Sequence, residues 1–287
     1  MDIDVDSNER CIKHWNDIDA RSALSAIQDL VDVLLKWDKS ISSNINIDRE
    51  ALQERWSEHR EDSHIDMLHL STYQSAAISH SCIAAFAPFV EGFYTHEFYW
   101  QQYLFETKDS YTTPNLLCQR WQICKTFNAY FWNPNKYVDK SLNVYTDIAR
   151  GIPQLIDALG MKDRMPDNYE EILACLFTYR NKSFHGGYEW TTENRRKFAK
   201  FIEEKAIRKT WFSCSTSGGE PQVYYATNEF IQVCLKACEY IVRSFDEMHY
   251  KWIQTKQYSR ADDLQFEKYM REKINQNNPQ PLQEEDI

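Results

Sequence analysis

Turn-forming residues are scarce in this chain, and their scarcity limits the folds that it can adopt. The 287 residues include only seven glycines and eight prolines. Because tight hairpin turns depend on these two residue types, a fold of many short strands is disfavoured. Apolar residues make up 43% of the chain and aromatic residues 14%, which is too many for a disordered polymer. We therefore expect an all-α fold with a sizeable core.

Apolar periodicity predicts where the helices lie. Between Ser22 and Ile41, apolar residues recur at the spacing of one buried helix face. A long apolar segment covers residues 70 to 105, and Pro88 is expected to kink or break its helix. Residues 223 to 225 are expected to pair as a short strand. Other helices are expected at 116 to 131, at 141 to 160, after a capping box of Asp167 and Glu170, from a cap at Thr191 or Thr192 to Lys209, and from Asn228 onward.

The chain shows no internal repeat and no convincing linker. We expect one elaborated helical domain over residues 1 to 274, whose motif-bearing half covers residues 150 to 257, followed by a polar, disordered tail at 275 to 287. The first residues are acidic and lack the apolar centre of a signal peptide. No uncharged apolar run approaches the roughly 18 residues of a membrane span. The expected location is cytoplasmic, away from membranes, with the eight cysteines reduced.

The net charge of −10 argues against a general nucleic-acid coat protein. Basic residues nevertheless outnumber acidic ones between residues 180 and 209, where a phosphate backbone would be attracted. The simpler alternative is a solvated helix face. The candidate RNA-binding residues are Lys182, Arg195, Arg196, Lys197 and Lys200.

The stretch TYRNKSFHGGYEW, residues 178 to 190, ends one of the expected helices. Asn181 and His185 are one turn apart on the same helix face, and Arg180 flanks them. Gly186 suits the left-handed position that follows a helix, which would leave His185 in the last turn. Cleavage of RNA by its own 2′-hydroxyl needs a base, and it needs positive charge where the phosphorane forms. The alternative is a helix end whose basic residues only complement the helix dipole.

The order R-N-K-S-F-H followed by G-G resembles the R-x(4–6)-H signature of the HEPN superfamily, in which a polar residue, often Asn, follows the Arg. The strong part of the resemblance covers residues 166 to 250, the segment from 70 to 100 fits an earlier helix of the bundle, and the inserts at 107 to 150 exceed a minimal domain of that family. It implies a compact helical bundle with the motif on a late central helix. It also implies a metal-independent endoribonuclease that needs no cofactor and acts as a toxin or antiviral effector.

The resemblance assigns roles to particular residues. Arg180 would stabilise the phosphate, Asn181 would position it, and His185 would act as acid or base. Some HEPN toxins carry a tyrosine that an antitoxin modifies, and Tyr188 matches it imperfectly because that tyrosine lies one residue closer to the histidine. Glu91, isolated in an apolar segment, could orient the site, although a satisfied core polar group is the commoner reading.

The resemblance also predicts partners. Active sites in the family are typically composite, with two copies of the motif meeting across a dimer interface. The expected partners are therefore RNA, a second subunit in a homodimer, and an antitoxin or regulatory protein.

Two other classes of function remain open. A HEPN-like module could bind nucleotide, RNA or a protein partner without cleaving it, and a helical assembly protein could use the motif for structure alone. The presence of both Arg180 and His185 favours the enzyme, because a binding module does not need that pair. Cys234 and Cys238 lie on an apolar stripe and are expected to be core thiols. No metal ligands are predicted.

Overall fold

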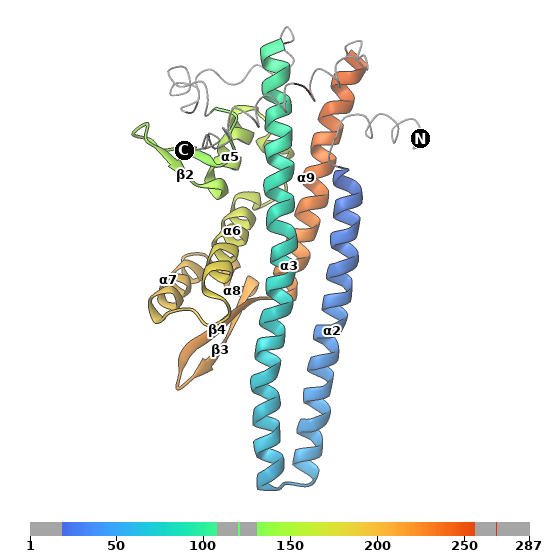
Figure 1. Cartoon of the computed structure of the whole chain (residues 1–287), viewed down its shortest axis with the longest axis vertical. Coiled ribbons are helices and arrows are strands. Elements are labelled where there is room, and N and C mark those ends of the chain that lie inside the picture. The colour runs from blue at the N-terminus through green and yellow to red at the C-terminus, as the bar shows by residue number, and fades with distance from the viewer. Residues whose placement is uncertain (1–18, 108–119, 121–130, 256–267, 269–287) are drawn as a thin grey trace, which may run out of the picture. The chain divides into compact units, whose positions relative to one another are not determined.

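The computed structural model describes residues 19–107, 120, 131–255 and 268 (Figure 1). Most of them are helical, and only two β-hairpins interrupt the helices, so the expected all-α class is confirmed. The contacts divide the chain into two compact units that interleave along the sequence. One comprises Arg21–Glu91 and Pro166–Ile241, and we call it the motif unit; the other comprises Met1–Ala20, Gly92–Met165 and Val242–Ile287. The single domain remains a prediction, and the expected tail lies outside the described residues.

Two long helices come first among the described residues: α2 (Ala20–Glu54) and α3 (Glu58–Thr107). The helix whose apolar period runs from Ser22 to Ile41 continues to Glu54 through a stretch in which no residue is buried. The expected break at Pro88 is wrong, since α3 runs through it without interruption. Pro88 is exposed, while Phe86 and Val90 on either side are buried. Packing of these neighbours holds the helix together where the proline removes one hydrogen bond.

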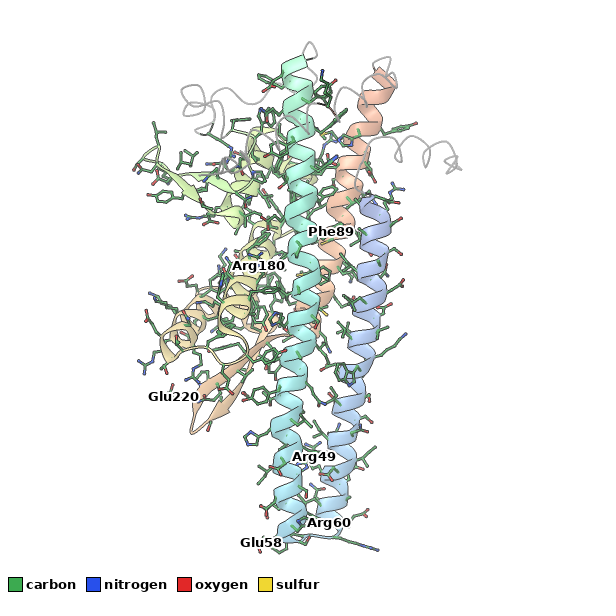
Figure 2. All side chains as sticks on the ribbon, in the orientation of Figure 1. Arg49, Glu58, Arg60, Phe89, Arg180 and Glu220 are labelled. Atoms are coloured by element: carbon green, nitrogen blue, oxygen red, sulfur yellow. The ribbon has the colours of Figure 1, made fainter. Side chains whose placement is uncertain are left out.

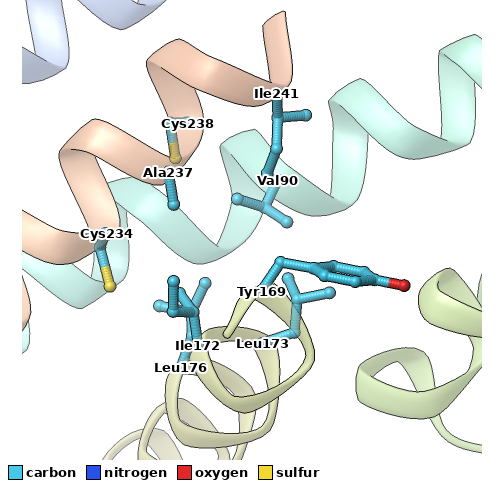
Figure 3. A pocket seen from close by; sticks show the side chains of 9 residues that line it. All are labelled: Val90, Tyr169, Ile172, Leu173, Leu176, Cys234, Ala237, Cys238 and Ile241. Atoms are coloured by element: carbon cyan, nitrogen blue, oxygen red, sulfur yellow. The ribbon is translucent and has the colours of Figure 1, made fainter. Parts of the chain in front are cut away.

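The motif unit centres on α6 (Tyr169–Gly186), which packs against α3 and α9 (Asn228–Thr255). Figure 3 shows the apolar side chains that these three helices bring together. They enclose a void of about 10 Å³, no larger than one water molecule needs. Burial raises the pKa of the Cys238 thiol to about 12, and Cys234 is equally buried. Both cysteines are core thiols, as predicted.

After α6 come α7 (Thr192–Glu203), α8 (Ala206–Trp211) and an antiparallel hairpin of β3 (Phe212–Ser217) and β4 (Glu220–Ala226). The Thr191 cap is confirmed, because its side chain accepts a hydrogen bond from the Asn194 amide at 3.3 Å. The strand expected at 223 to 225 is confirmed within β4.

The helix expected to run to Lys209 is divided in two, because Lys205 adopts an extended backbone between α7 and α8. Glu171 on α6 explains the division, since it binds both Lys205 and the buried Arg208. Burial opposes ionisation of Glu171, but hydrogen bonds from these two cations outweigh it and hold its pKa below the ordinary value. The ion pairs therefore fix α8 to α6.

The start of α6 also departs from expectation. The capping residue is Asn168, in a left-handed conformation with φ of 59°, and its side chain makes no capping hydrogen bond. The predicted capping box of Asp167 and Glu170 is therefore wrong. The first residue of α6, Tyr169, is buried in the core, so tertiary packing rather than a local cap fixes the start of this helix.

The second unit contains a hairpin of β1 (Lys136–Val138) and β2 (Val144–Thr146), followed by α5 (Ile148–Ala158) and a 3₁₀ turn (Lys162–Arg164). The helix expected over 141 to 160 is therefore shorter, and Asp147 caps it through the Arg150 amide at 3.1 Å. Buried Arg120 donates to the carbonyl oxygens of Phe131 and Asn133, which fixes the segment before the hairpin. Nearly all of the helix expected at 116 to 131 lies outside the described residues.

From Ser42 to Leu70, α2 and α3 form a stretch that we call the distal hairpin, and no residue in it is buried. Its exposed side chains include Ile47 and Trp56. Figure 2 shows Arg49, Glu58 and Arg60 near its tip. Farther along α3 is a window that is apolar and long enough to cross a membrane by composition alone, and half of that window is buried, as in the core helix of a folded protein.

Candidate functional site

The end of α6 depends on its two glycines. Gly187 has φ of 62°, and its amide donates to the Ser183 carbonyl at 2.9 Å, which closes the last turn. The glycine with positive φ is therefore Gly187, one position after the predicted Gly186, and its ψ of −141° differs from the left-handed helical conformation. Gly186 has a different constraint, since a Cβ there would lie 2.9 Å from the Trp190 ring. The absence of a side chain at Gly186 lets the Trp190 ring pack against the end of α6, and the Trp190 Nε1 donates to the Gly187 carbonyl at 3.0 Å.

Arg180 occupies the last part of α6, half-buried, on the motif unit (Figure 2). Its Nη1 donates to Asn181 Oδ1 at 3.0 Å, and its guanidinium carbon lies 5.6 Å from the centre of the Phe184 ring. No carboxylate forms an ion pair with Arg180 among the residues that the structure describes. Because its charge is not neutralised within the unit, the guanidinium can accept an anion such as phosphate.

Asn181 and His185 are both exposed. They are one helical turn apart, a rise of about 6 Å along α6. Asn181 therefore connects the guanidinium of Arg180 to the helix face that carries His185. The predicted trio lies together at one helix end, where an anion held by Arg180 would be within reach of an imidazole.

A histidine that the sequence did not single out also lies at this helix end. The ring of His80, on α3, is centred 4.7 Å from Phe184 and 5.9 Å from Tyr188. Its Nδ1 is buried without a hydrogen-bond partner among the described residues. Burial lowers the pKa of His80, which favours the neutral imidazole.

Tyr73 lies two turns before His80 on α3 and donates its hydroxyl to Glu189. This contact raises the pKa of Tyr73. The only local signal for either residue was their spacing of seven, which places them on one face of α3. Nothing near them in the sequence indicates that this face meets the motif.

Glu91 does not approach the motif. The preceding residue, Val90, packs with Leu173 in the first half of α6, and the helix rises about 18 Å from Leu173 to His185. Glu91 is half-buried at that far end. The carboxylate that does come near the motif is Glu189, which follows Tyr188 in the loop after α6.

The predicted RNA-binding residues differ in how available they are. Arg195 donates to the Pro221 carbonyl at 2.9 Å and also binds Gln222, so it joins α7 to the β3–β4 hairpin. Lys197 pairs with Glu193 at 2.5 Å. Both cations therefore have protein partners.

Lys182 is half-buried, with its Nζ 3.4 Å from Asn194 Oδ1 and 6.0 Å from the Trp190 ring centre. Burial lowers the pKa of Lys182. Arg196 and Lys200 are exposed on α7. Of the basic surface expected from the sequence, Arg195 is occupied by the β3–β4 hairpin, whereas Arg180, Arg196, Lys200 and Lys197, which is exposed beside Glu193, remain accessible.

Two other features of the motif unit bear on ligand binding. A cavity of about 230 Å³ lies among α2, α3, β4 and the start of α9, and none of the motif residues lines it. Its carboxylate, Asp38, accepts hydrogen bonds from Ser75 at 3.1 Å and Asn228 at 3.0 Å, so it already has partners. Across the described ranges, no group of three His, Cys, Asp or Glu side chains could hold a metal ion.

Comparison of the chain with protein-family models, with curated proteins and with solved structures gives no match. The fold and the site define a mostly helical protein with an arginine, an asparagine and a histidine gathered at the end of a central helix. The resemblance to the HEPN superfamily rests on that motif.

Proposed function

We propose that this protein is a metal-independent endoribonuclease of HEPN type, which acts in the cytoplasm as a toxin or in antiviral defence. The observation that supports the proposal most is the guanidinium of Arg180, which has no ion-pair partner in the described part of the chain and is hydrogen-bonded to Asn181 one turn from the exposed His185. Such a group of side chains at a helix end can bind a phosphate and transfer a proton beside it.

The reaction uses the RNA itself as the nucleophile. A base takes the proton of the 2′-hydroxyl, and the 2′-oxygen attacks the adjacent phosphorus. Arg180 stabilises the negative charge of the phosphorane, with Asn181 fixing the orientation of the guanidinium. The 5′-oxygen then leaves with a proton from an acid. The products are a 2′,3′-cyclic phosphate and a 5′-hydroxyl, and no cofactor takes part.

One copy of the motif contributes one exposed imidazole, whereas the reaction needs both a base and an acid. A homodimer in which two copies of Arg180 and His185 share one cleft would supply both groups. Twofold dimers are the commonest assemblies of soluble proteins. An antitoxin or regulatory protein is a further partner under this proposal, and Tyr188, exposed beside the motif, is a residue that it could modify.

The decisive experiment incubates purified protein with labelled RNA in EDTA. We expect cleavage that leaves a 2′,3′-cyclic phosphate, while DNA of the same sequence stays intact because it lacks the nucleophile. His185→Ala and Arg180→Ala should each slow cleavage at least about 100-fold and leave the melting temperature near that of the wild type. His69→Ala, which removes an exposed histidine elsewhere on α3, is the matched control and should cleave normally. Dependence on a divalent metal, or equal cutting of DNA, would contradict the mechanism.

The alternative is a HEPN-like module that binds nucleotide, RNA or a protein partner without cleaving it. The distal hairpin favours a protein partner, because it exposes apolar side chains such as Ile47 and Trp56 and buries none. The two functions are distinguished by the EDTA experiment. Purified protein that binds RNA or a partner but leaves labelled RNA intact would support the module.

A further inference from the structure

Two exposed aromatic residues, Phe184 and Tyr188, contact His80 near the end of α6, and a third, Tyr73, lies two turns before His80 on α3. Phe184 is 50% exposed, Tyr188 41% and Tyr73 38%. They come from α3, from α6 and from the loop that follows α6. We call these three rings together with His80 the aromatic platform.

Protein contacts hold the platform in place. The ring of His80 is tilted by 47° against Phe184 and meets Tyr188 edge-on at 81°. Tyr73 is held through its hydroxyl bond to Glu189. These rings therefore keep fixed positions although large parts of their faces are in water. Exposed aromatic rings gathered in this way typically mark a binding surface.

The platform is continuous with the candidate catalytic residues. Phe184 is the ring that both His80 and Arg180 contact, with the Arg180 guanidinium 5.6 Å from its centre. His185 follows Phe184 directly in the chain. A ligand with a phosphate on Arg180 would thus have its neighbouring groups beside Phe184 and Tyr188.

We infer that the aromatic platform stacks an unpaired nucleobase of the RNA whose phosphate Arg180 binds, so that the substrate class is single-stranded RNA. Bases present their faces to aromatic side chains only when they leave the helical stack, as in loops and single strands. The carboxylate beside the platform, Glu189, already accepts a hydrogen bond from the Tyr73 hydroxyl. Phe184 and Tyr188 are the stacking residues, and His80 positions their rings.

This inference rests on the proposed function for the cleavage step, but its test does not require cleavage. The full chain is mixed with a single-stranded 2′-O-methyl RNA that cannot be cut and that carries one 2-aminopurine. Fluorescence anisotropy gives the dissociation constant, and quenching of 2-aminopurine reports stacking. We expect the wild type to quench 2-aminopurine. We expect Phe184→Ala to bind the RNA about 10-fold more weakly than the wild type does.

Trp37→Ala provides the matched control, because Trp37 is an aromatic residue 48% exposed on α2 of the same unit. It should bind like the wild type, and Phe184→Trp should keep most of the affinity because it keeps a ring. Tyr188→Ala is a second test should Phe184→Ala fail to fold, which circular dichroism would reveal. A duplex of the same sequence should bind more weakly than the single strand.

Several results would overturn the inference: no binding or no quenching by the wild type, equal affinity for the duplex, or equal affinity of Phe184→Ala and Trp37→Ala. Cleavage of unmodified RNA is measured in parallel. Cleavage without stacking would reject the platform and leave the endoribonuclease proposal intact. Stacking without cleavage would support the platform and reject the enzyme.

Discussion

At the scale of single residues, the site depends on which polar groups have partners. Among the described residues, Arg180 contacts Asn181 and an aromatic ring, whereas Arg195 binds the β3–β4 hairpin and Lys197 pairs with Glu193 one turn away on α7. A half-buried cation attracts an anion more strongly than one in open water, because the surrounding medium screens it less. The charge of Arg180 therefore has more effect on ligand binding than the local excess of basic residues suggests.

Because the imidazole of His80 is partly buried, we expect the stability of the protein to depend on pH. Because burial lowers the pKa of His80, the unfolded chain binds more protons than the folded one below the ordinary histidine pKa of about 6.5. The free energy of unfolding should therefore fall as pH drops below that value. Among the described residues, the ring of His80 contacts Phe184 and Tyr188, Arg180 lies against the Phe184 ring, and the Tyr73–Glu189 pair is two turns away along α3.

The measurement is urea unfolding of the wild type and of His80→Gln at pH 7.5 and pH 5.5. The variant should lose less stability on acidification than the wild type does. His69→Gln, on the exposed part of α3, is the control and should follow the wild type. Parallel pH profiles for His80→Gln and the wild type would show that His80 has no such role.

At the scale of elements, α6 joins the core to the site. Its first half packs on α3 and α9, and its second half carries the motif. Ser79 of α3 donates to the Tyr179 hydroxyl at 3.1 Å, and Tyr179 in turn donates to the Tyr224 carbonyl at 3.2 Å. This buried chain of hydrogen bonds fixes α6 against α3 and β4 one residue before Arg180.

The same substitution on two helices should have very different effects. Leu173 on α6 is 2% exposed and lines the small void, whereas Leu68 in the distal hairpin is 43% exposed. Leu173→Ala should lower the free energy of unfolding by about 2 to 5 kcal/mol, because it enlarges a cavity that cannot collapse fully. Leu68→Ala should change it by less than about 0.5 kcal/mol. Urea titrations of both variants test this, and equal losses would show that the distal hairpin is packed in solution.

At the scale of the whole molecule, the described residues form two compact units, and the site belongs to one of them. Every residue of the motif and of the aromatic platform lies within the motif unit. The second unit is thus not needed to assemble these side chains. What one copy lacks is a second exposed imidazole in its motif, and that is the reason for proposing a dimer.

We expect light scattering to give twice the mass of one 34.2 kDa chain. Specific activity should fall as the protein is diluted below the dissociation constant of the dimer, because each shared cleft needs two copies of Arg180 and His185. Phe184→Ala should leave the mass unchanged, which separates substrate binding from assembly. A monomer with constant specific activity on dilution would rule out the shared cleft.

Much of this architecture is determined by short stretches of sequence. The scarcity of glycine and proline predicts the helical class, Thr191 predicts a helix start, and residues 223 to 225 predict a strand. The motif of Arg180, Asn181 and His185 was recognisable because residues one turn apart share a helix face whatever the rest of the chain does. Local geometry alone sets such features.

Other features were decided only when distant segments packed together. His80 and Tyr73 reach the motif from about a hundred residues away, α3 continues through Pro88, and Glu171 takes up Lys205 and Arg208. Each of these depends on which helix faces meet, and one sequence pattern is compatible with many pairings. The sequence by itself determined the helical class and the chemical groups at the end of α6, whereas the tertiary structure decided where several helices begin and end, which cations stay available at the motif and which rings lie beside it. The physical reason is that periodicity acts within a few turns of chain, while burial and charge pairing are properties of surfaces in contact.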